Sequence, residues 1–148
     1  MIVQKSIEIA SPPDKIWSFL IEPEKIMKWC FTLKNFKYTG EQRSGVGTPI
    51  YFEEKAAGQL MKLNFAITEW VEKQELAFKM TSGNFVKGYE QKWLVEAIPS
   101  GSKFTYMEKI KLPFGFIGKI MEVFARRGSE ATVTEMLTKL KSLAEAKE

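Results

Sequence analysis

Residues 89–124 read YEQKWLVEAIPSGSKFTYMEKIKLPFGFIGKIMEVF, and within this stretch the spacing of the apolar residues changes. Up to Leu112 apolar and polar residues alternate, as in strands with one buried face, and the turn residues PSGS divide the alternation into two strands. After Pro113 the apolar residues recur every three or four positions, which predicts an amphipathic helix. The stretch therefore predicts a pair of antiparallel strands followed by a helix of about thirty residues.

The chain from residue 33 to residue 88 repeats the alternating pattern. Short turn clusters, such as SGN at 82–84, separate runs in which every second residue is apolar. Each run keeps a polar face, as expected of strands that cover a core on one side. The pattern predicts a meander of about six strands between residues 33 and 112. Its earlier apolar rows are Ile50 and Phe52; Met61, Leu63, Phe65 and Ile67; and Leu76, Phe78 and Met80.

The N-terminal part predicts one strand and two short helices. Alternation over residues 3–9 is typical of a half-buried strand. Ser11 then takes the N-cap position of a helix, with Pro12 at the first helical position and Asp14 in the capping-box position. Pro23 interrupts this helix, and EPEKIMKWC starts a second one. The apolar positions of the two helices are Ile16, Trp17 and Leu20, then Ile26, Met27 and Trp29.

The order of these elements predicts an α+β fold. One antiparallel sheet is expected to curl around the long final helix, with the core between sheet and helix. A curled sheet does not touch the helix everywhere, so an internal cavity is expected at one end. No linker or repeat divides the chain, and we expect a single domain over residues 1–148.

The composition excludes several kinds of chemistry. The 148 residues include one cysteine, Cys30, and no histidine. An intramolecular disulfide, a His-based catalytic triad, a haem histidine ligand and a mixed Cys/His zinc site are therefore ruled out. Cys30 is expected to be a small buried hydrophobic residue, because no histidine is present to activate it. We expect no metal and no cofactor.

Charge and hydropathy argue against nucleic-acid and membrane-spanning classes. The 22 Lys and Arg and 18 Asp and Glu give a net charge of +4, which is spread along the chain rather than clustered. The N-terminus is too polar for a signal peptide, and no apolar run approaches the ~20 residues of a transmembrane segment. The GVGT at 45–48 lacks the lysine of a phosphate-binding loop and predicts a bent entry into a strand. A cytoplasmic protein without a nucleic-acid partner is expected.

Five motifs in a fixed order connect this chain to a known superfamily: SIEIASPPDKIWSFL, EPEKIMKW, GVGT, ITEWVEKQELAF and KLPFGFIGKIMEVFARR. Together they resemble the START-like, or SRPBCC, superfamily with the Bet v 1-like helix-grip fold, and within it the polyketide cyclase/dehydrase-like and CoxG-like small proteins. The resemblance covers nearly the whole chain. It implies a seven-stranded sheet that grips the C-terminal helix around an apolar pocket for lipids, polyketides or other hydrophobic molecules. It does not imply one reaction.

Gln91 and Glu108 are the two polar residues that interrupt otherwise apolar rows. An inward-facing polar group needs a partner, because burying it without one costs on the order of a few kcal/mol. Glu108 in an apolar pocket would have a raised pKa, and would serve as a general acid/base or orient a ligand. Two alternatives stand beside this hypothesis. Glu108 pairs with a neighbouring lysine at the sheet rim, or the strand register differs from the one inferred here.

Large aromatic residues share those rows. Tyr89, Trp93 and Tyr106 offer apolar surfaces with polar tips, which suits the lining of a ligand pocket, although aromatic residues at strand spacing are often simply core. Phe65, from an earlier inward-facing row, completes the aromatic ligand-binding candidates.

The final helix adds further candidates. Gly128 and Ala131 stand where large residues would complete its apolar stripe, so they leave room either for a ligand or for close packing on a strand. The segments at 114–116 and 83–85 are candidate lids at a pocket entrance. Lys119 and the arginines at 126–127 form a basic flank that would suit acidic lipids if the apolar face of the helix were free. In the expected fold that face is buried.

Three functional hypotheses follow. The first is a protein that binds a hydrophobic small molecule, such as a lipid, an isoprenoid or a polyketide, as a monomer or weak homodimer. The second is an enzyme of cyclase or dehydratase type with Glu108 as acid/base and Tyr89 or Tyr106 as hydrogen-bond donor. The third is a CoxG-like accessory protein, which would expose an apolar patch outside the cavity.

Overall fold

The computed structural model describes residues 1–147, and its elements follow the predicted order. They are β1 (Ile2–Ile9), α1 (Pro13–Ile21), α2 (Pro23–Trp29), β2 (Leu33–Tyr38), β3 (Pro49–Ala56), β4 (Gln59–Val71), β5 (Glu75–Gly83), β6 (Gly88–Ile98), β7 (Gly101–Lys111) and α3 (Gly115–Glu145). Among these residues no helix is long and apolar enough to cross a membrane.

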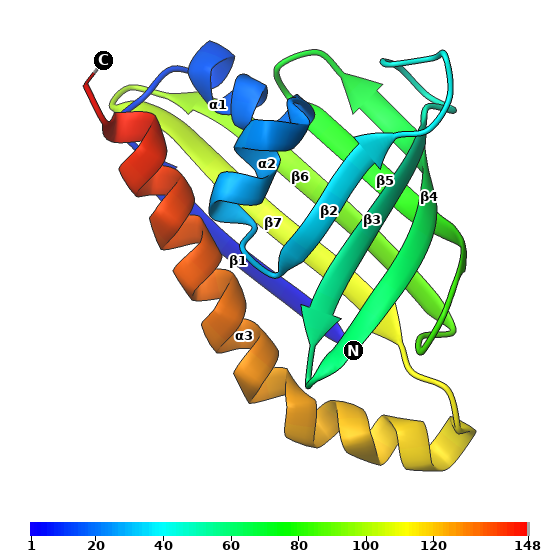
Figure 1. The fold of residues 1–148 in the computed structure, drawn as a ribbon. Helices are drawn as coiled ribbons and strands as arrows, with labels where there is room; N and C mark the ends of the chain where they lie inside the picture. Colours follow the sequence, from blue (N-terminus) through cyan, green and yellow to red (C-terminus); the bar gives the residue numbers. More distant parts are fainter. Residues whose placement is uncertain (148) are drawn as a thin grey trace.

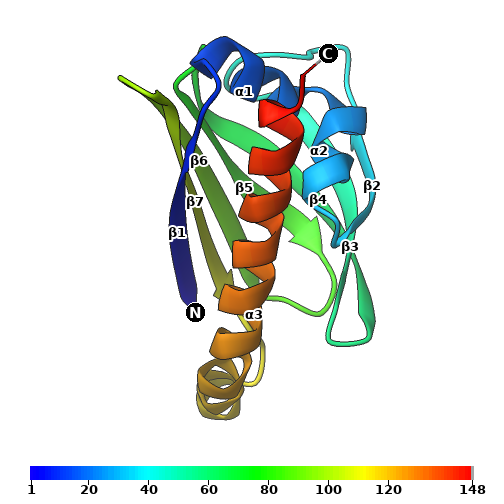
Figure 2. The ribbon, with the colours of Figure 1, turned by 90° about the vertical axis from the view of Figure 1, so that its left-hand side faces the viewer.

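The seven strands form one antiparallel sheet in the order β1-β7-β6-β5-β4-β3-β2. Strands β2 to β7 pair with their sequence neighbours, and β1 closes the order by pairing with β7. The two short helices carry the chain from one edge of the sheet to the other. Figure 1 shows the sheet curled, with α3 crossing its concave side. In the perpendicular view of Figure 2, α3 stands in front of the sheet between β1 and β3.

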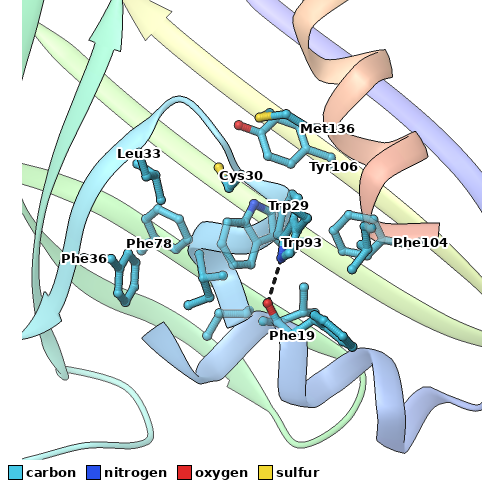
Figure 3. Close-up of a cluster of buried hydrophobic side chains, with 14 of the residues drawn as sticks. Phe19, Trp29, Cys30, Leu33, Phe36, Phe78, Trp93, Phe104, Tyr106 and Met136 are labelled. Carbon is cyan, nitrogen blue, oxygen red and sulfur yellow. Dashed lines mark hydrogen bonds between the residues drawn. The ribbon is translucent and has the colours of Figure 1, made fainter. Parts of the chain in front are cut away.

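The core fills the space between the sheet, α2 and the second half of α3. Trp29, which is fully buried, lies near its centre, and its indole N–H donates to the Phe19 carbonyl at 2.8 Å (Figure 3). Its ring meets Trp93 and Phe104 edge-on, with centroids 5.2 and 5.8 Å apart. The predicted rows of β4 and β6 all point into this core, so the register inferred from their alternation is correct. From α3 the core takes Val133, Met136, Leu137, Leu140 and Ala144.

The start of α1 differs from the prediction. The helix begins at Pro13, and Pro12 is the N-cap in an extended conformation (φ −70°, ψ 157°). A residue that precedes a proline is disfavoured in the helical region, and Pro12 precedes Pro13, so the helix starts one residue later than predicted. Ser11 is therefore not the cap; its hydroxyl is buried without a hydrogen-bond partner. Asp14 lies in the first turn and pairs with Lys73 at 3.4 Å.

The first half of α3 also departs from the prediction. Its apolar face was expected to be buried, yet Ile117 is 63% and Phe124 is 81% exposed. A 31-residue helix is about 46 Å long, whereas the 11 residues of β7 span about 36 Å. The helix is thus longer than the sheet that grips it. Its first turns run past the end of the sheet, as Figure 1 shows.

Candidate functional site

A cavity of about 720 Å³ lies between the end of the sheet and the first half of α3. Its buried part is formed by β3, β4, β6 and β7 together with Val133 and Met136 of α3. Its outer part includes Phe85 from the β5–β6 loop and Phe114, Met121 and Phe124 from the start of α3, all of them exposed. This pocket lies at one end of the fold, the place where the sequence leads us to expect a cavity.

Two carboxylates, Glu54 and Glu108, line the buried part of this cavity. Glu54 comes from β3 and Glu108 from β7, and the hydroxyl of Tyr89 on β6 lies between them. That hydroxyl is 2.9 Å from Glu54 Oε1 and 3.2 Å from Glu108 Oε2. The hydroxyl of Tyr106 donates to the same Oε2 at 3.0 Å. We call Glu54 and Glu108 the carboxylate pair.

The Tyr89 hydroxyl is fixed by a hydrogen-bond chain that leads away from the cavity. The indole N–H of Trp93 donates to Gln91 Oε1 at 2.9 Å, and Gln91 Nε2 donates to the Tyr89 oxygen at 2.9 Å. The hydroxyl has one proton of its own to donate. Its contacts with both carboxylates are therefore full hydrogen bonds only when one carboxyl is itself protonated. The geometry thus favours a pair that holds one proton.

The electrostatics agree with that geometry. Burial, followed by the negative charge of Glu54, raises the pKa of Glu108 from its ordinary 4.5 to about 7. Burial likewise raises the pKa of the Glu54 carboxyl. Burial also raises the pKa values of the Tyr89 and Tyr106 hydroxyls well above their usual range, so both remain protonated donors. Near neutral pH, the Glu108 carboxyl is thus partly protonated.

Neither carboxylate is paired with a cation. Within residues 1–147, no lysine or arginine forms a salt bridge with Glu54 or Glu108. The alternative in which Glu108 pairs with a lysine at the sheet rim is therefore wrong, because Glu108 points into the buried end of the cavity, away from the solvated lysines. Its side chain is 6% exposed.

The candidate residues from the sequence fall into two layers. Tyr89, Tyr106, Glu108 and Gly128 line the cavity itself. A Cβ added at Gly128 would meet nothing within 4 Å, so close packing on a strand does not explain this glycine.

The remaining three candidates lie behind that lining. Gln91 and Trp93 form the hydrogen-bond chain that holds Tyr89. Phe65 stacks on Phe52 with ring centroids 4.4 Å apart and belongs to the core. These three side chains support the site from outside the cavity.

Two polar residues at the buried end of the site are absent from the sequence-based candidates. Glu54 stands two positions after Phe52 and four after Ile50, so the strand spacing already placed it on the inward face. However, Glu54 stands within the charged run EEK at 53–55, and such a run is typical of a solvated strand end. Thr32, whose hydroxyl donates to Glu54 Oε2 at 3.0 Å, lies in the turn before β2, where no periodicity points to it.

Cys30 does not take part in the site chemistry. Its thiol is buried and free, and burial raises its pKa well above the usual range. The described residues also contain no group of acidic, cysteine or histidine side chains arranged to hold a metal ion.

Solved structures with this fold share little sequence with the chain. A protein from Thermus thermophilus is 16% identical over 96% of this chain and 95% of its own, with a TM-score of 0.79. A START superfamily protein from Mycobacterium smegmatis is 15% identical over 97% of each chain, with a TM-score of 0.75. The di-domain ARO/CYC protein StfQ from the steffimycin biosynthetic pathway is 13% identical over 97% of this chain and 50% of that chain, with a TM-score of 0.73.

At such identities these structures establish the fold alone, and they confirm the predicted Bet v 1-like helix-grip architecture. No curated protein gives a significant match to the sequence. A family model described as polyketide cyclase / dehydrase and lipid transport matches residues 1–145. Because that match covers almost the whole chain, the protein belongs to the polyketide cyclase/dehydrase and lipid transport family.

Proposed function

We propose that the protein binds a hydrophobic small molecule, such as a lipid, an isoprenoid or a polyketide, in the cavity between the sheet and α3. The observation that carries this proposal is the cavity itself. Its volume of about 720 Å³ falls in the range of ~300–1,000 Å³ that is usual for ligand pockets. Its walls are largely apolar, and its buried polar residues are Glu54, Tyr89, Tyr106 and Glu108.

This arrangement would orient the ligand within the cavity. An apolar body would lie against Met121, Phe124 and Val133, where burial of its surface supplies the affinity. A polar end would reach Glu108 and the two tyrosine hydroxyls. The exposed Phe85 and Phe114 stand at the outer side, where the ligand enters.

A pair of matched tryptophan variants tests the proposal. Thr132 lines the cavity, whereas Thr138 is an exposed residue of the same helix. We expect Thr132→Trp to reduce binding of the apolar fluorophore Nile red by at least about ten-fold, because the indole fills the cavity, and Thr138→Trp to leave it unchanged. Equal binding by both variants, or no binding by the wild-type protein, would contradict the proposal.

A catalytic role for the same site is the second candidate. Glu108 has a pKa of about 7, which suits a general acid/base near neutral pH, and two tyrosine hydroxyls converge on it. A cyclase or dehydratase that acts on a carbonyl compound would use Glu108 to move a proton and Tyr89 or Tyr106 to hold the carbonyl oxygen. Such an enzyme would lose turnover in Glu108→Gln while it still bound Nile red.

An accessory role at a membrane surface is the third candidate, and one feature of α3 favours it. Six large apolar residues at its start are exposed. Besides Met121 they are Phe116, Ile117, Ile120, Val123 and Phe124, and we call these five the exposed α3 face. Lys111, Lys119 and the arginines at 126–127 flank this face, and Glu122, the acidic residue between them, is paired with the N-terminus at 3.0 Å. An apolar face with a basic flank suits an anionic lipid surface.

Co-sedimentation with vesicles tests this third role. The protein should pellet with vesicles that contain anionic lipid, and with neutral vesicles it should remain in solution. Dimerisation through the exposed α3 face, detected by light scattering together with a failure to bind vesicles, would contradict it.

A further inference from the structure

The carboxylate pair points to the class of the ligand. We propose that the polar end of the ligand is a protonated amine held at Glu54 and Glu108, so that the cavity takes a hydrophobic amine rather than a fatty acid or a neutral alcohol. This inference rests on the proposed function, because it names the ligand class of the same cavity.

The charges around the buried end of the cavity all have one sign. The titratable groups that face the carboxylate pair are Tyr89 from β6, Tyr106 from β7 and Cys30 at the end of α2, and each becomes negative or stays neutral. From α3, the cavity is lined there by the uncharged Val133 and Met136. A cation is the charge that this environment lacks.

The cations elsewhere on the cavity wall do not neutralise Glu54 or Glu108. Lys55 lines the cavity but is exposed, and it forms no salt bridge among the described residues. The amino group of Met1 is engaged by Glu122 at 3.0 Å and by the Ile110 carbonyl at 2.8 Å. The carboxylate pair therefore has no counter-ion from the described part of this chain.

One acceptor atom of the pair is open toward the cavity. Glu108 Oε2 accepts hydrogen bonds from Tyr89 and Tyr106, whereas Oε1 has no hydrogen-bond partner among residues 1–147. The side chain is more than nine-tenths buried and lines the cavity. Glu108 Oε1 is not among the fully buried atoms that lack a partner, so it is accessible from the cavity and free to accept a hydrogen bond from a bound ligand.

An ammonium group suits this open acceptor better than the other polar ends. It carries three N–H donors, no acceptor and one positive charge. With one proton shared in the carboxylate pair, that positive charge makes the whole group neutral. An alcohol brings one donor and no charge, and a fatty acid would bring a further negative charge next to Glu54 and Glu108.

Three ligands with the same alkyl chain separate these classes: decylamine, decanol and decanoate, each titrated against protein with bound Nile red as the displaced probe. We expect decylamine to bind at least about ten-fold more tightly than decanol, and decanoate to bind weakest. Between about pH 6 and pH 8, Glu108 loses its proton while an alkylammonium, whose pKa is near ~10, stays charged. Affinity for decylamine should therefore rise over this range, and affinity for decanol should not.

Two isosteric variants locate the effect. Glu54→Gln/Glu108→Gln removes both negative charges that the carboxylate pair can carry and should bring the affinities of decylamine and decanol together. Glu53→Gln removes a charge from the neighbouring residue on the other face of β3 and should leave the preference unchanged. Should Glu54→Gln/Glu108→Gln fail to fold, the pH comparison on the wild-type protein decides the question.

The outcomes distinguish this inference from the proposed function. Displacement of Nile red by decanol as strong as that by decylamine, or a preference that survives in Glu54→Gln/Glu108→Gln, would overturn the amine and leave the hydrophobic cavity standing. If none of the three ligands displaces Nile red and Thr132→Trp binds it like the wild type, the proposed function itself fails.

Discussion

The two ends of the space between sheet and α3 are built from the same rows of residues but differ in chemistry. At the packed end, around Trp29 and Trp93, aromatic rings meet edge-on and fill the interior. At the cavity end, the same rows continue with polar groups: Glu54 follows Phe52 on β3, and Glu108 follows Tyr106 on β7. The packed end supplies the stability that offsets the cost of burying these two carboxylates, with which no cation of residues 1–147 forms a salt bridge.

The largest expected effect comes from breaking the packed end. Trp29→Ala removes a fully buried indole and its contacts with three aromatic rings, and should lower the free energy of unfolding by about 3–5 kcal/mol. Trp70→Ala, at a half-buried indole, should cost clearly less. Urea denaturation measures both, and equal losses would show that the packed end is not the source of stability.

The buried Glu108 at the cavity end should make the free energy of unfolding depend on pH. The pKa of Glu108 in the folded protein, about 7, lies above its ordinary 4.5, so its stabilising contribution is complete below about pH 4.5 and is lost as the pH rises through about 7. The difference between the Glu108 pKa values in the folded and unfolded protein corresponds to about 3 kcal/mol of unfolding free energy.

Urea denaturation of the wild type and Glu108→Gln at acidic and alkaline pH checks this expectation. The variant should lack this part of the pH dependence and be the more stable protein at alkaline pH. A wild type whose stability rises across this range in step with the variant would argue against a buried, unpaired Glu108.

A smaller effect is expected from the hydrogen bonds at the cavity end. Tyr106→Phe removes one of the two donors to Glu108 Oε2, which should cost about 1 kcal/mol at alkaline pH and raise the Glu108 pKa further. Tyr51→Phe, on the outer face of β3, is the matched control. An NMR titration of the glutamate carboxyl carbons measures the pKa, and an unshifted Glu108 in Tyr106→Phe would contradict the assigned hydrogen bond.

The smallest effect on stability is expected at the exposed α3 face. Phe116→Ser, at a residue that is 77% exposed, should change the free energy of unfolding by less than about 0.5 kcal/mol while it weakens co-sedimentation with anionic vesicles. Val46→Ser, at a 63% exposed apolar residue in the β2–β3 loop, should leave vesicle binding unchanged. Equal losses of vesicle binding in Phe116→Ser and Val46→Ser would show that the exposed α3 face has no special role in binding vesicles.

The same contrast explains what the sequence can predict. Strand alternation is a local property, so the inward rows, with Gln91 and Glu108 as their polar members, follow from spacing alone. Where the polar groups meet is a long-range property. The approach of Glu54 on β3 to Tyr89 on β6 depends on how strongly the sheet curls, and no spacing along the chain reports that.

The two halves of α3 illustrate a second limit. Both halves carry amphipathic spacing, and the exposure of the first half depends on the length of the sheet beside it. Ile117 and Val133 are both apolar residues at amphipathic spacing in α3, yet Ile117 is 63% exposed and Val133 is 2% exposed. The N-terminus of α1 shows a local conflict instead, since the capping preference of Ser11 yields to the steric restriction that Pro13 imposes on Pro12.

Mass spectrometry of the solvent extract from purified protein tests the central claim, that the cavity holds a hydrophobic ligand, most directly. Wild-type protein and Thr138→Trp should release the same hydrophobic molecule in near-stoichiometric amount, and Thr132→Trp should release little of it. Equal release from all three proteins, or release from none together with no binding of added Nile red, would contradict the account.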